Sequence, residues 1–521
     1  MDWAERPLLW GGAALSLGLA VAIPKDRANL RIYKHGRRLR GAEEVTSAEF
    51  NHRNQSDGVA FVTLEPPKLS ERLRGRDGSR VRIPRSIEDN HVITMGDSGG
   101  GKSTLIRGLL TQVAERGETA IVYDPALEYT GQFYSPERGD IILNPLDERM
   151  PYWPIAHEVI RPAEALTLAT SLFPESDREN IFFAQGGRKI FAHLLNLKPT
   201  PQELLAWLSD EHELERRLKG TPLAAMIYEN AGPQRGGMLA SLSMVADSLR
   251  LLPVKMPSLP IFTVAEWAKH PLGWIFVTSI PEAREQLRGL ISMWLDMMVL
   301  RLMNQGKRGS RPVWFVLDEL ASLHRLPQLH TAITQNRKSG HPVVLGFQGR
   351  SQLEAIYGHQ AEVMFSCPST KIFLKTSEPR AARWISDTLG EVEIERLRES
   401  RTHGQMPQRR ESRSYQLEHE IRPLIMKEEI MGLPKGHGFL KCGNLVVRMS
   451  FPYLELPERH PAFLERKPPS DGADGSPSPT NPTQPSQPSD PAAAEEPGTT
   501  PSNPETKADT DEESEQTKFF K

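Results

Sequence analysis

The sequence has 521 residues, of which 38% are hydrophobic, so it is long enough for two or three domains with real cores. Two cysteines, Cys367 and Cys442, exclude a disulfide framework and favour a reducing compartment. The formal net charge of −2 hides an asymmetry, because residues 467–521 contain eleven acidic and four basic residues, a net of −7 that leaves +5 on the rest. A mildly basic body with an acidic tail is compatible with nucleic acid but does not demonstrate it.

An apolar run, Leu8–Ile23, lies near the start of the chain and is at the short end of the lengths that cross a bilayer as a helix. Basic residues follow it, so the positive-inside rule predicts that everything downstream is cytoplasmic. A cleaved signal peptide ending near Ala20-Val21-Ala22 and a buried core helix are the alternatives. Residues 25–75 are polar and basic, and predict a juxtamembrane segment with short strands whose side chains face lipid, DNA phosphate or solvent.

A phosphate-binding loop is predicted between an apolar strand, His91–Met95, and a helix, Leu105–Glu115. Glycines let successive backbone N–H groups turn toward one anion, and the helix start points its free amides to the same place. Lys102 would then contact the β- and γ-phosphates and Ser103 would bind Mg²⁺, whereas a glycine-rich turn that merely contains a lysine is the alternative. The loop comprises Gly96, Gly99, Gly100, Gly101, Lys102, Ser103 and Thr104.

Strands and helices alternate after this loop, which predicts a parallel sheet. Ala120–Asp124 and Asp140–Leu143 are predicted strands. Residues 161–252 then show helical periodicity broken by Pro and Gly, with no strand, so they predict an all-helical insertion. Strands resume at Trp274–Val277, and a long helix is predicted over Pro281–Asn304.

Two further strands end in polar side chains. Pro312–Leu317 is a continuous apolar run followed by Asp318 and Glu319, and Pro342–Phe347 is followed by Gln348. In P-loop enzymes the first acid holds the Mg²⁺ shell and the second polarises the attacking water. Because parallel strands deliver their carboxyl ends to one crevice, Gln348 is predicted to sense the γ-phosphate. A chance acid pair and a loop-starting glutamine are the alternatives.

The last part of the chain contains a predicted strand, Lys371–Lys375, a helix, Ala381–Leu389, and a strand pair, Gly438–Met449. Residues 467–521 are rich in Pro, Ser and acidic residues, and are predicted to be disordered. The two aromatics at Phe519-Phe520 suit either a docking peptide or an inert solvated tail.

Taken in order, several stretches resemble the conjugative coupling proteins of type IV secretion, the TraD/TrwB family, along most of residues 40–450. The resemblance implies an α/β fold: a RecA-like P-loop domain with a mostly parallel central sheet and an inserted all-alpha domain. The stretches that support it are Arg40-Gly41-Ala42-Glu43, the phosphate loop, Tyr123-Asp124-Pro125, Leu143-Asn144-Pro145-Leu146-Asp147, Trp314–Glu319, Gly346-Phe347-Gln348 and Leu389-Gly390-Glu391.

The resemblance also implies a function. Such motors form a homo-hexameric ring at the bacterial inner membrane, use ATP and Mg²⁺, and pass a relaxase bound to single-stranded DNA from the relaxosome to the secretion channel. The all-alpha domain would meet DNA or the relaxosome, and Arg337 falls where the family has a proposed arginine finger, although an exposed helix arginine explains it as well. Members typically have two membrane helices, whereas this sequence offers one short apolar segment.

Two other functions fit the same motifs. One is a chromosomal DNA pump of the FtsK/HerA kind, for which several membrane spans or a DNA-orienting winged-helix module would be expected, and neither is visible in the sequence. The other is a membrane-tethered adaptor that uses nucleotide as a switch to recruit secretion substrates. The predicted parts of the chain are a transmembrane anchor (1–24), a basic juxtamembrane segment (25–75), a first nucleotide-binding part (76–160), an all-alpha insertion (161–255), a second nucleotide-binding part (256–466) and an acidic tail (467–521).

Overall fold

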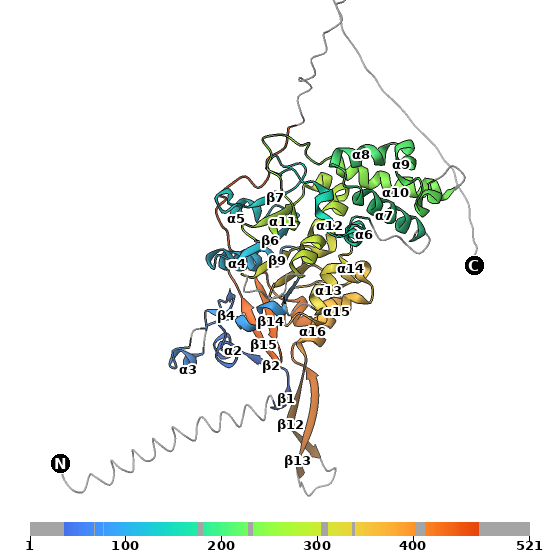
Figure 1. Ribbon diagram of the computed structural model, residues 1–521. Helices are drawn as coiled ribbons and strands as arrows, with labels where there is room; N and C mark the ends of the chain where they lie inside the picture. The colour runs from blue at the N-terminus through green and yellow to red at the C-terminus, as the bar shows by residue number, and fades with distance from the viewer. Residues whose placement is uncertain are drawn as a thin grey trace, which may run out of the picture. The chain divides into compact units, whose positions relative to one another are not determined.

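A large sheet organises the computed structural model, which describes residues 36–467 except 67, 77, 174–180, 228–232, 304–310, 336–338 and 403–411. Ten strands follow the order β2-β15-β14-β11-β5-β10-β9-β6-β8-β7 (Figure 1). From β7 to β11 in this order all neighbours run parallel, β14 is antiparallel to β11, and β15 is antiparallel to β14. The strands are β2 (Glu43–Val45), β5 (Val92–Met95), β6 (Thr119–Asp124), β7 (Ile141–Leu143), β8 (Ile275–Thr278), β9 (Val313–Leu317), β10 (Val343–Phe347), β11 (Thr370–Leu374), β14 (His437–Cys442) and β15 (Leu445–Ser450).

The central strands are covered on both faces. Every residue of β5, β6, β9 and β10 is buried, as their continuous apolar runs predict for parallel strands. Successive side chains enter different cores: Ile93 and Met95 of β5 belong to one hydrophobic cluster, and Val92 belongs to the other. The sheet therefore separates two hydrophobic cores. Polar residues follow the carboxyl ends of β9 and β10, at the edge of the sheet.

Helices form the outer layers. Helix α4 packs on one face with the small β3–β4 sheet, whereas α12 and α13 to α16 contribute to the core on the other face. The smaller strands are β1 (Arg37–Gly41), β3 (Ala60–Val62), β4 (Arg80–Arg82), β12 (Glu391–Thr402) and β13 (Ser412–Pro423). The helices are α2 (Ser47–Asn54), α3 (Leu69–Arg72), α4 (Lys102–Glu115), α5 (Thr130–Phe133), α6 (Pro162–Leu172), α7 (Ile181–Asn196), α8 (Pro201–Ser209), α9 (Glu211–Leu218), α10 (Pro233–Leu249), α11 (Val264–Trp267), α12 (Arg284–Met303), α13 (Pro327–Gln335), α14 (Arg350–Tyr357), α15 (Gln360–Ser366), α16 (Pro379–Leu389) and α17 (Lys427–Met431).

Helices α6 to α10 occupy the stretch for which the sequence predicts a helical insertion, and the described residues from 162 to 249 contain no strand. Helix α12 packs against this group of helices. Gly289 of α12 packs so closely on the end of α6 that an added Cβ would lie 2.4 Å from the carbonyl oxygen of Leu172. The two helices are thus held backbone to backbone at this point, while the boundaries of the insertion as a domain stay a prediction.

A buried aspartate fastens the same helix to two neighbours. The hydroxyl of Ser171 in α6 donates to Asp296 Oδ2 at 2.6 Å, and the amides of Gln328 and Leu329 at the start of α13 donate to Oδ1 at 2.8 and 3.1 Å. Burial raises the pKa of Asp296 to about 7. We call these four residues the α12 junction.

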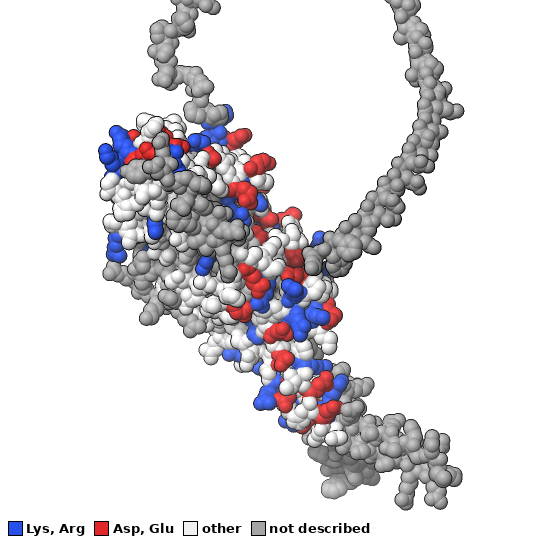
Figure 2. Space-filling model, turned by 90° about the vertical axis from the view of Figure 1, so that its right-hand side faces the viewer, with Lys and Arg blue, Asp and Glu red and all other residues white. Residues whose placement is uncertain are grey.

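A separate three-stranded sheet, ordered β1-β12-β13, was not predicted from the sequence. Figure 1 shows β12 and β13 as a long ribbon beyond β2 and β15. Val392 and Ile394 are buried at its base, whereas Ile421, which pairs with Glu393 between them, and Leu417 further out are exposed. On the face shown in Figure 2 the basic and acidic side chains of the described residues are interspersed rather than gathered by sign.

The ends of the chain lie largely outside this description. The predicted transmembrane anchor (1–24) and nearly all of the predicted disordered tail (467–521) fall on residues that are not described. Among the residues that are described, no helix combines the length and the apolar character needed to cross a bilayer. From residue 36 onward the predicted juxtamembrane segment contains short strands, as expected, and one of them, β2, joins the large sheet beside β15.

Candidate active site

The glycine-rich loop connects β5 to α4, in the context that the sequence predicts. Gly99 and Gly101 have φ values of 73° and 112°, in the region that favours glycine over other residues. A Cβ added to Gly101 would also lie 2.7 Å from the ring of Phe451. Because α4 begins at Lys102, the free amides of its first turn, including that of Ser103, point toward the loop.

Neighbouring segments hold this loop in position. The amide of Gly96 donates to the last carbonyl of β10 at 3.4 Å, and the amide of Asp97 donates to the carbonyl of Lys375 at 2.9 Å. From the opposite side, the amide of Gly436 donates to the carbonyl of Gly100 at 3.2 Å. The loop is therefore shaped by three parts of the chain that are distant in sequence.

The polar residues that end β9 and β10 meet the lysine of the loop. Lys102 Nζ lies 3.4 Å from Asp318 Oδ1 and 3.3 Å from Glu319 Oε2, and Gln348 Nε2 donates to Glu319 Oε2 at 2.9 Å. The strand order β5-β10-β9 creates this proximity. Gly346 permits it, because a Cβ there would lie 2.2 Å from the carbonyl oxygen of Asp318.

Asp318 is buried and keeps one carboxylate oxygen without a hydrogen bond. Tyr129 donates its hydroxyl proton to Oδ2 at 2.7 Å, while Oδ1 has no hydrogen-bond partner among the described residues and only Lys102 nearby. Burial, with the adjacent Asp318 carboxylate second, raises the pKa of Tyr129 well above its ordinary value. The tyrosine thus remains a proton donor to Asp318.

These groups fit a Mg²⁺ ion. A hydroxyl from Ser103 and an under-coordinated carboxylate oxygen of Asp318 lie in one cluster, and hard oxygen ligands are those that Mg²⁺ prefers. The described residues contain no group of three His, Cys, Asp or Glu side chains arranged around a metal. That donor set suits a metal whose shell is completed by phosphate oxygens and water rather than by a protein cage.

Asp124, at the end of β6, plays a structural part. It is fully buried, and it accepts the amides of Glu128, Tyr129 and Thr130 at 2.8, 2.9 and 2.8 Å, together with the hydroxyl of Thr130 at 2.7 Å. Burial raises the pKa of this carboxyl, and the hydrogen bonds oppose that shift. Asp124 therefore fixes the turn from which Tyr129 reaches Asp318.

The loop, the acids and the glutamine line one pocket of about 950 Å³. This is enough room for a nucleoside triphosphate. Three basic residues of the pocket were not predicted: Arg107, which pairs with Glu128 at 3.5 Å, Arg284 and Lys435. The pocket is lined by Asp97, Ser98, Gly99, Gly101, Lys102, Ser103, Thr104, Arg107, Pro125, Ala126, Glu128, Arg284, Asp318, Glu319, Gln348, Lys435, Gly436, Phe451 and Tyr453.

Besides Arg107, which lies on α4 just after the phosphate loop, the site residues Tyr129, Arg284, Lys435 and Phe451 escaped the sequence analysis, and these four lie away from a recognisable motif. Tyr129 and Arg284 follow the ends of β6 and β8, the edge where parallel strands present ligand-binding groups, so strand position was the available signal. Lys435 and Phe451 have no local signal, because β14 and β15 bring them back to the loop. Arg337, the predicted arginine finger, lies outside the described residues.

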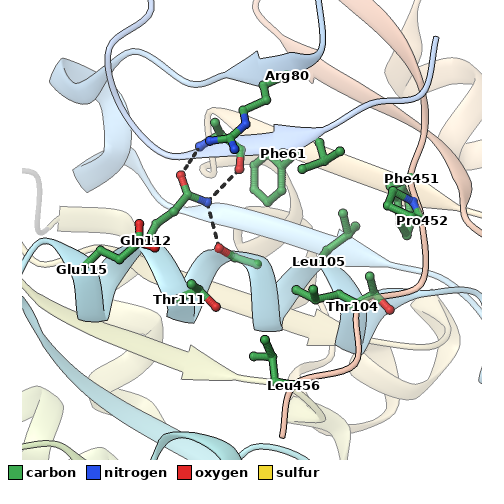
Figure 3. A pocket seen from close by; sticks show the side chains of 14 residues that line it. Phe61, Arg80, Thr104, Leu105, Thr111, Gln112, Glu115, Phe451, Pro452 and Leu456 are labelled. Atoms are coloured by element: carbon green, nitrogen blue, oxygen red, sulfur yellow. Dashed lines mark hydrogen bonds between the residues drawn. The ribbon is translucent and has the colours of Figure 1, made fainter.

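A second cavity, of about 250 Å³, lies along α4 and is mostly apolar (Figure 3). Gln112 bridges it to β3, accepting the amide of Ala60 at 2.8 Å and donating to the Ala60 carbonyl at 2.7 Å. Phe61 and Leu105 form its walls. Thr104 and Phe451 line both cavities, so the two share a wall.

Residues 78–452 match the family described as the type IV secretion-system coupling protein DNA-binding domain. The chain belongs to this family. Its sequence is 28% identical to the coupling protein TraD of Escherichia coli (strain K12) over 435 residues, which are 79% of this chain and 60% of TraD. The chain thus spans well under two thirds of that relative's length.

Solved structures of another coupling protein agree with this membership. The unbound conjugative coupling protein TrwBdeltaN70 is 26% identical, with a TM-score of 0.70 over 83% of this chain and 97% of that one. TrwB in complex with ADP and Mg²⁺ is also 26% identical, with a TM-score of 0.69 over 83% of this chain and 98% of that one. The α/β fold predicted from the sequence is confirmed by these neighbours and by the large mixed sheet.

Proposed function

We propose that this chain is an ATP-driven coupling protein that moves DNA toward a type IV secretion channel during conjugation. The observation that supports it most directly is the cluster of Lys102, Asp318, Glu319 and Gln348 around a glycine-rich loop. Family membership and the ADP–Mg²⁺ complex of TrwB support the same ligands here.

The phosphates would bind at the loop and the first turn of α4. Lys102 would exchange its two carboxylate neighbours for oxygens of the β- and γ-phosphates. Ser103 and Asp318 would hold Mg²⁺, which supplies positive charge to the phosphate oxygens when bound. Tyr129 keeps Asp318 oriented for this role, and Asp124 keeps the tyrosine in place.

Hydrolysis would be assisted by Glu319 and Gln348. Glu319 Oε2 would accept a proton from the water that attacks the γ-phosphate. Gln348 donates to that same oxygen, so it fixes the orientation of the carboxylate and can register a change in it. When Lys102 turns from Glu319 to the phosphates, Glu319 would lose its contact with the lysine and keep its hydrogen bond from Gln348.

The wider assembly is proposed from the family. The motor would act as a homo-hexamer at the bacterial inner membrane, receive a relaxase with its single-stranded DNA from the relaxosome, and deliver both to the channel components. Helices α6 to α10 would contact DNA or the relaxosome. Arg337 would reach into a neighbouring subunit's site, where its guanidinium would supply positive charge to the transition state.

ATP turnover by the full chain tests this proposal. The rate per subunit should rise with protein concentration, because ring assembly completes the site, and rise again with single-stranded DNA. Double-stranded DNA tested in parallel distinguishes a pump for duplex DNA. The logarithm of DNA affinity should fall linearly with the logarithm of salt concentration if phosphates are the main contacts.

Tight nucleotide binding without turnover, with or without DNA, would contradict the motor and favour a nucleotide-switched adaptor. Stimulation by duplex DNA alone would favour a chromosomal pump. A DNA affinity that does not respond to salt would contradict binding through phosphates.

A further inference from the structure

Arg284 enters the candidate active site from the side of the acids. It is the first residue of α12, and its Nη2 donates to the carbonyl of Pro125 at 2.7 Å. Its Nε is buried and has no hydrogen-bond partner among the described residues, and no described carboxylate lies within ion-pair distance of it. The guanidinium is partly buried, and a buried donor such as this Nε is costly to leave unused unless an anion or another acceptor meets it.

The pocket has four basic residues, and they differ in their partners. Lys102 lies between Asp318 and Glu319, and Arg107 is paired with Glu128. Lys435 is exposed and lies next to Gly436, whose amide binds the phosphate loop. Arg284 lines the pocket without a carboxylate partner among the described residues and has a buried, unused Nε donor, so it has the strongest need of a further anion.

The position of Arg284 points to the terminal phosphate. It shares the pocket with Glu319, and the hydroxyl of Tyr123 lies within electrostatic reach of both side chains. Tyr123 in turn hydrogen-bonds Ser322, whose hydroxyl donates to the carbonyl of Glu319 at 2.8 Å. Arg284 and Glu319, the acid assigned to the attacking water, therefore line the same pocket and both lie near Tyr123.

Helix α12 extends from this arginine to the insertion. Gly289, little more than one turn beyond Arg284, packs directly on the backbone of Leu172 in α6. The α12 junction, with Asp296 at its centre, ties the same helix to α6 and α13. Arg284 thus begins a continuous helix that makes two close contacts with α6.

We propose that Arg284 binds the γ-phosphate within its own subunit and reports its presence through α12 to the helical insertion. This inference rests on the proposed function, since it needs a nucleoside triphosphate in the pocket. It assigns to the subunit itself one of the cations that stabilise the γ-phosphate. It also gives the insertion a mechanical connection to the nucleotide state.

Nucleotide discrimination tests the first part. The affinities of ADP and of a non-hydrolysable ATP analogue are measured with Mg²⁺ for the full-length wild type, Arg284→Ala and Arg284→Lys. Arg284→Ala should weaken the analogue about tenfold and change ADP less than about twofold, since a charge-assisted hydrogen bond is lost only with the triphosphate. The affinity of Arg284→Lys for the analogue should lie between those of the wild type and of Arg284→Ala.

The matched control is Lys435→Ala, which removes the same charge from another residue of the pocket and should change both affinities by one common factor. The assignment would be overturned if Arg284→Ala weakened the two nucleotides equally, or if it weakened neither of them. A wild type that binds neither nucleotide would instead refute the proposed function.

Hydrogen exchange tests the second part. In the wild type, the ATP analogue should protect amides of α12 and of the end of α6 more than ADP does, and Arg284→Ala should abolish that difference. Identical exchange of α6 with the two nucleotides in the wild type would overturn the transmission.

Discussion

The active-site pocket and the α12 junction each bury an aspartate, but they satisfy it in different ways. At the junction both oxygens of Asp296 accept hydrogen bonds, from Ser171 and from the amides that start α13. In the pocket Asp318 has one oxygen bound by Tyr129, while the other has a nearby lysine and no hydrogen bond. A carboxylate completed by its own protein holds a fold together, whereas one left incomplete is available to a ligand.

The same contrast applies to charge. The pKa of Asp296 is raised to about 7 by burial, and no Lys or Arg of the described residues forms an ion pair with it. Asp318 has Lys102 within 3.4 Å and Tyr129 as a proton donor. Changing these residues should therefore alter catalysis in the pocket and pH-dependent stability at the junction.

The largest effect is expected from Lys102→Ala. ATP turnover should fall by about 10³-fold or more, because the γ-phosphate loses its principal cation. Steady-state hydrolysis with single-stranded DNA measures this. Lys269→Ala, an exposed lysine paired with Glu266, is the control and should keep the wild-type rate. Normal DNA-stimulated turnover in Lys102→Ala would refute the assignment of the pocket.

Glu319→Gln should separate binding from chemistry. The amide keeps the size of the side chain but accepts a proton poorly, so ATP affinity should stay within a few-fold while turnover falls about 10²-fold. Equilibrium binding and single-turnover hydrolysis report the two quantities. Glu354→Gln, on the surface of α14, is the matched control. A wild-type rate in Glu319→Gln would show that the water is activated elsewhere.

Asp296→Asn should act on stability, with a pH dependence of defined sign. A carboxyl whose folded pKa is raised contributes stability fully below its unfolded pKa, near 3.8, and loses it as the pH rises through about 7. The oxygen of an asparagine can accept from both amides and its Nδ2 can donate to the Ser171 hydroxyl oxygen, so the variant keeps three contacts without ionising and should become more stable relative to the wild type between pH 4 and 8. The change is expected to be on the order of a few kcal/mol.

Thermal unfolding of both proteins across this pH range measures the difference. Asp387→Asn, an exposed aspartate of α16, is the control and should show no such trend. A constant difference between wild type and Asp296→Asn at all pH values would contradict a raised pKa at the junction.

The phosphate loop and the acidic pair Asp318 and Glu319 could be predicted, because each motif and the strand or helix beside it are contiguous in the sequence. A strand, a glycine-rich turn and a helix lie together in the chain, and so do an apolar run and the acids that follow it. The sequence could not predict Lys435 or Phe451 as site residues, since only the pairing of β14 and β15 with distant strands brings them to the phosphate loop. Their roles are carried by position, which a linear pattern does not record.

The fold shows the same division. Strands buried on both faces, such as β9 and β10, were predicted from continuous apolar runs. The β1-β12-β13 sheet was missed, because charged residues alternate along it and no continuous apolar face distinguishes it from a solvated loop. Likewise β2 has only three residues, and it belongs to the large sheet because β15 accepts it as a neighbour.

Phe451 and Gly436 contact the phosphate loop, although they are synthesised long after it. The amide of Gly436 binds the loop, Phe451 donates its own amide to the carbonyl of Gly436 at 2.8 Å, and the Phe451 ring packs on Gly101. A ribosome has made Gly101 more than three hundred residues before it makes Phe451. A nascent chain therefore lacks these contacts to the phosphate loop until residue 451 has been made, so the loop reaches its final packing late in synthesis.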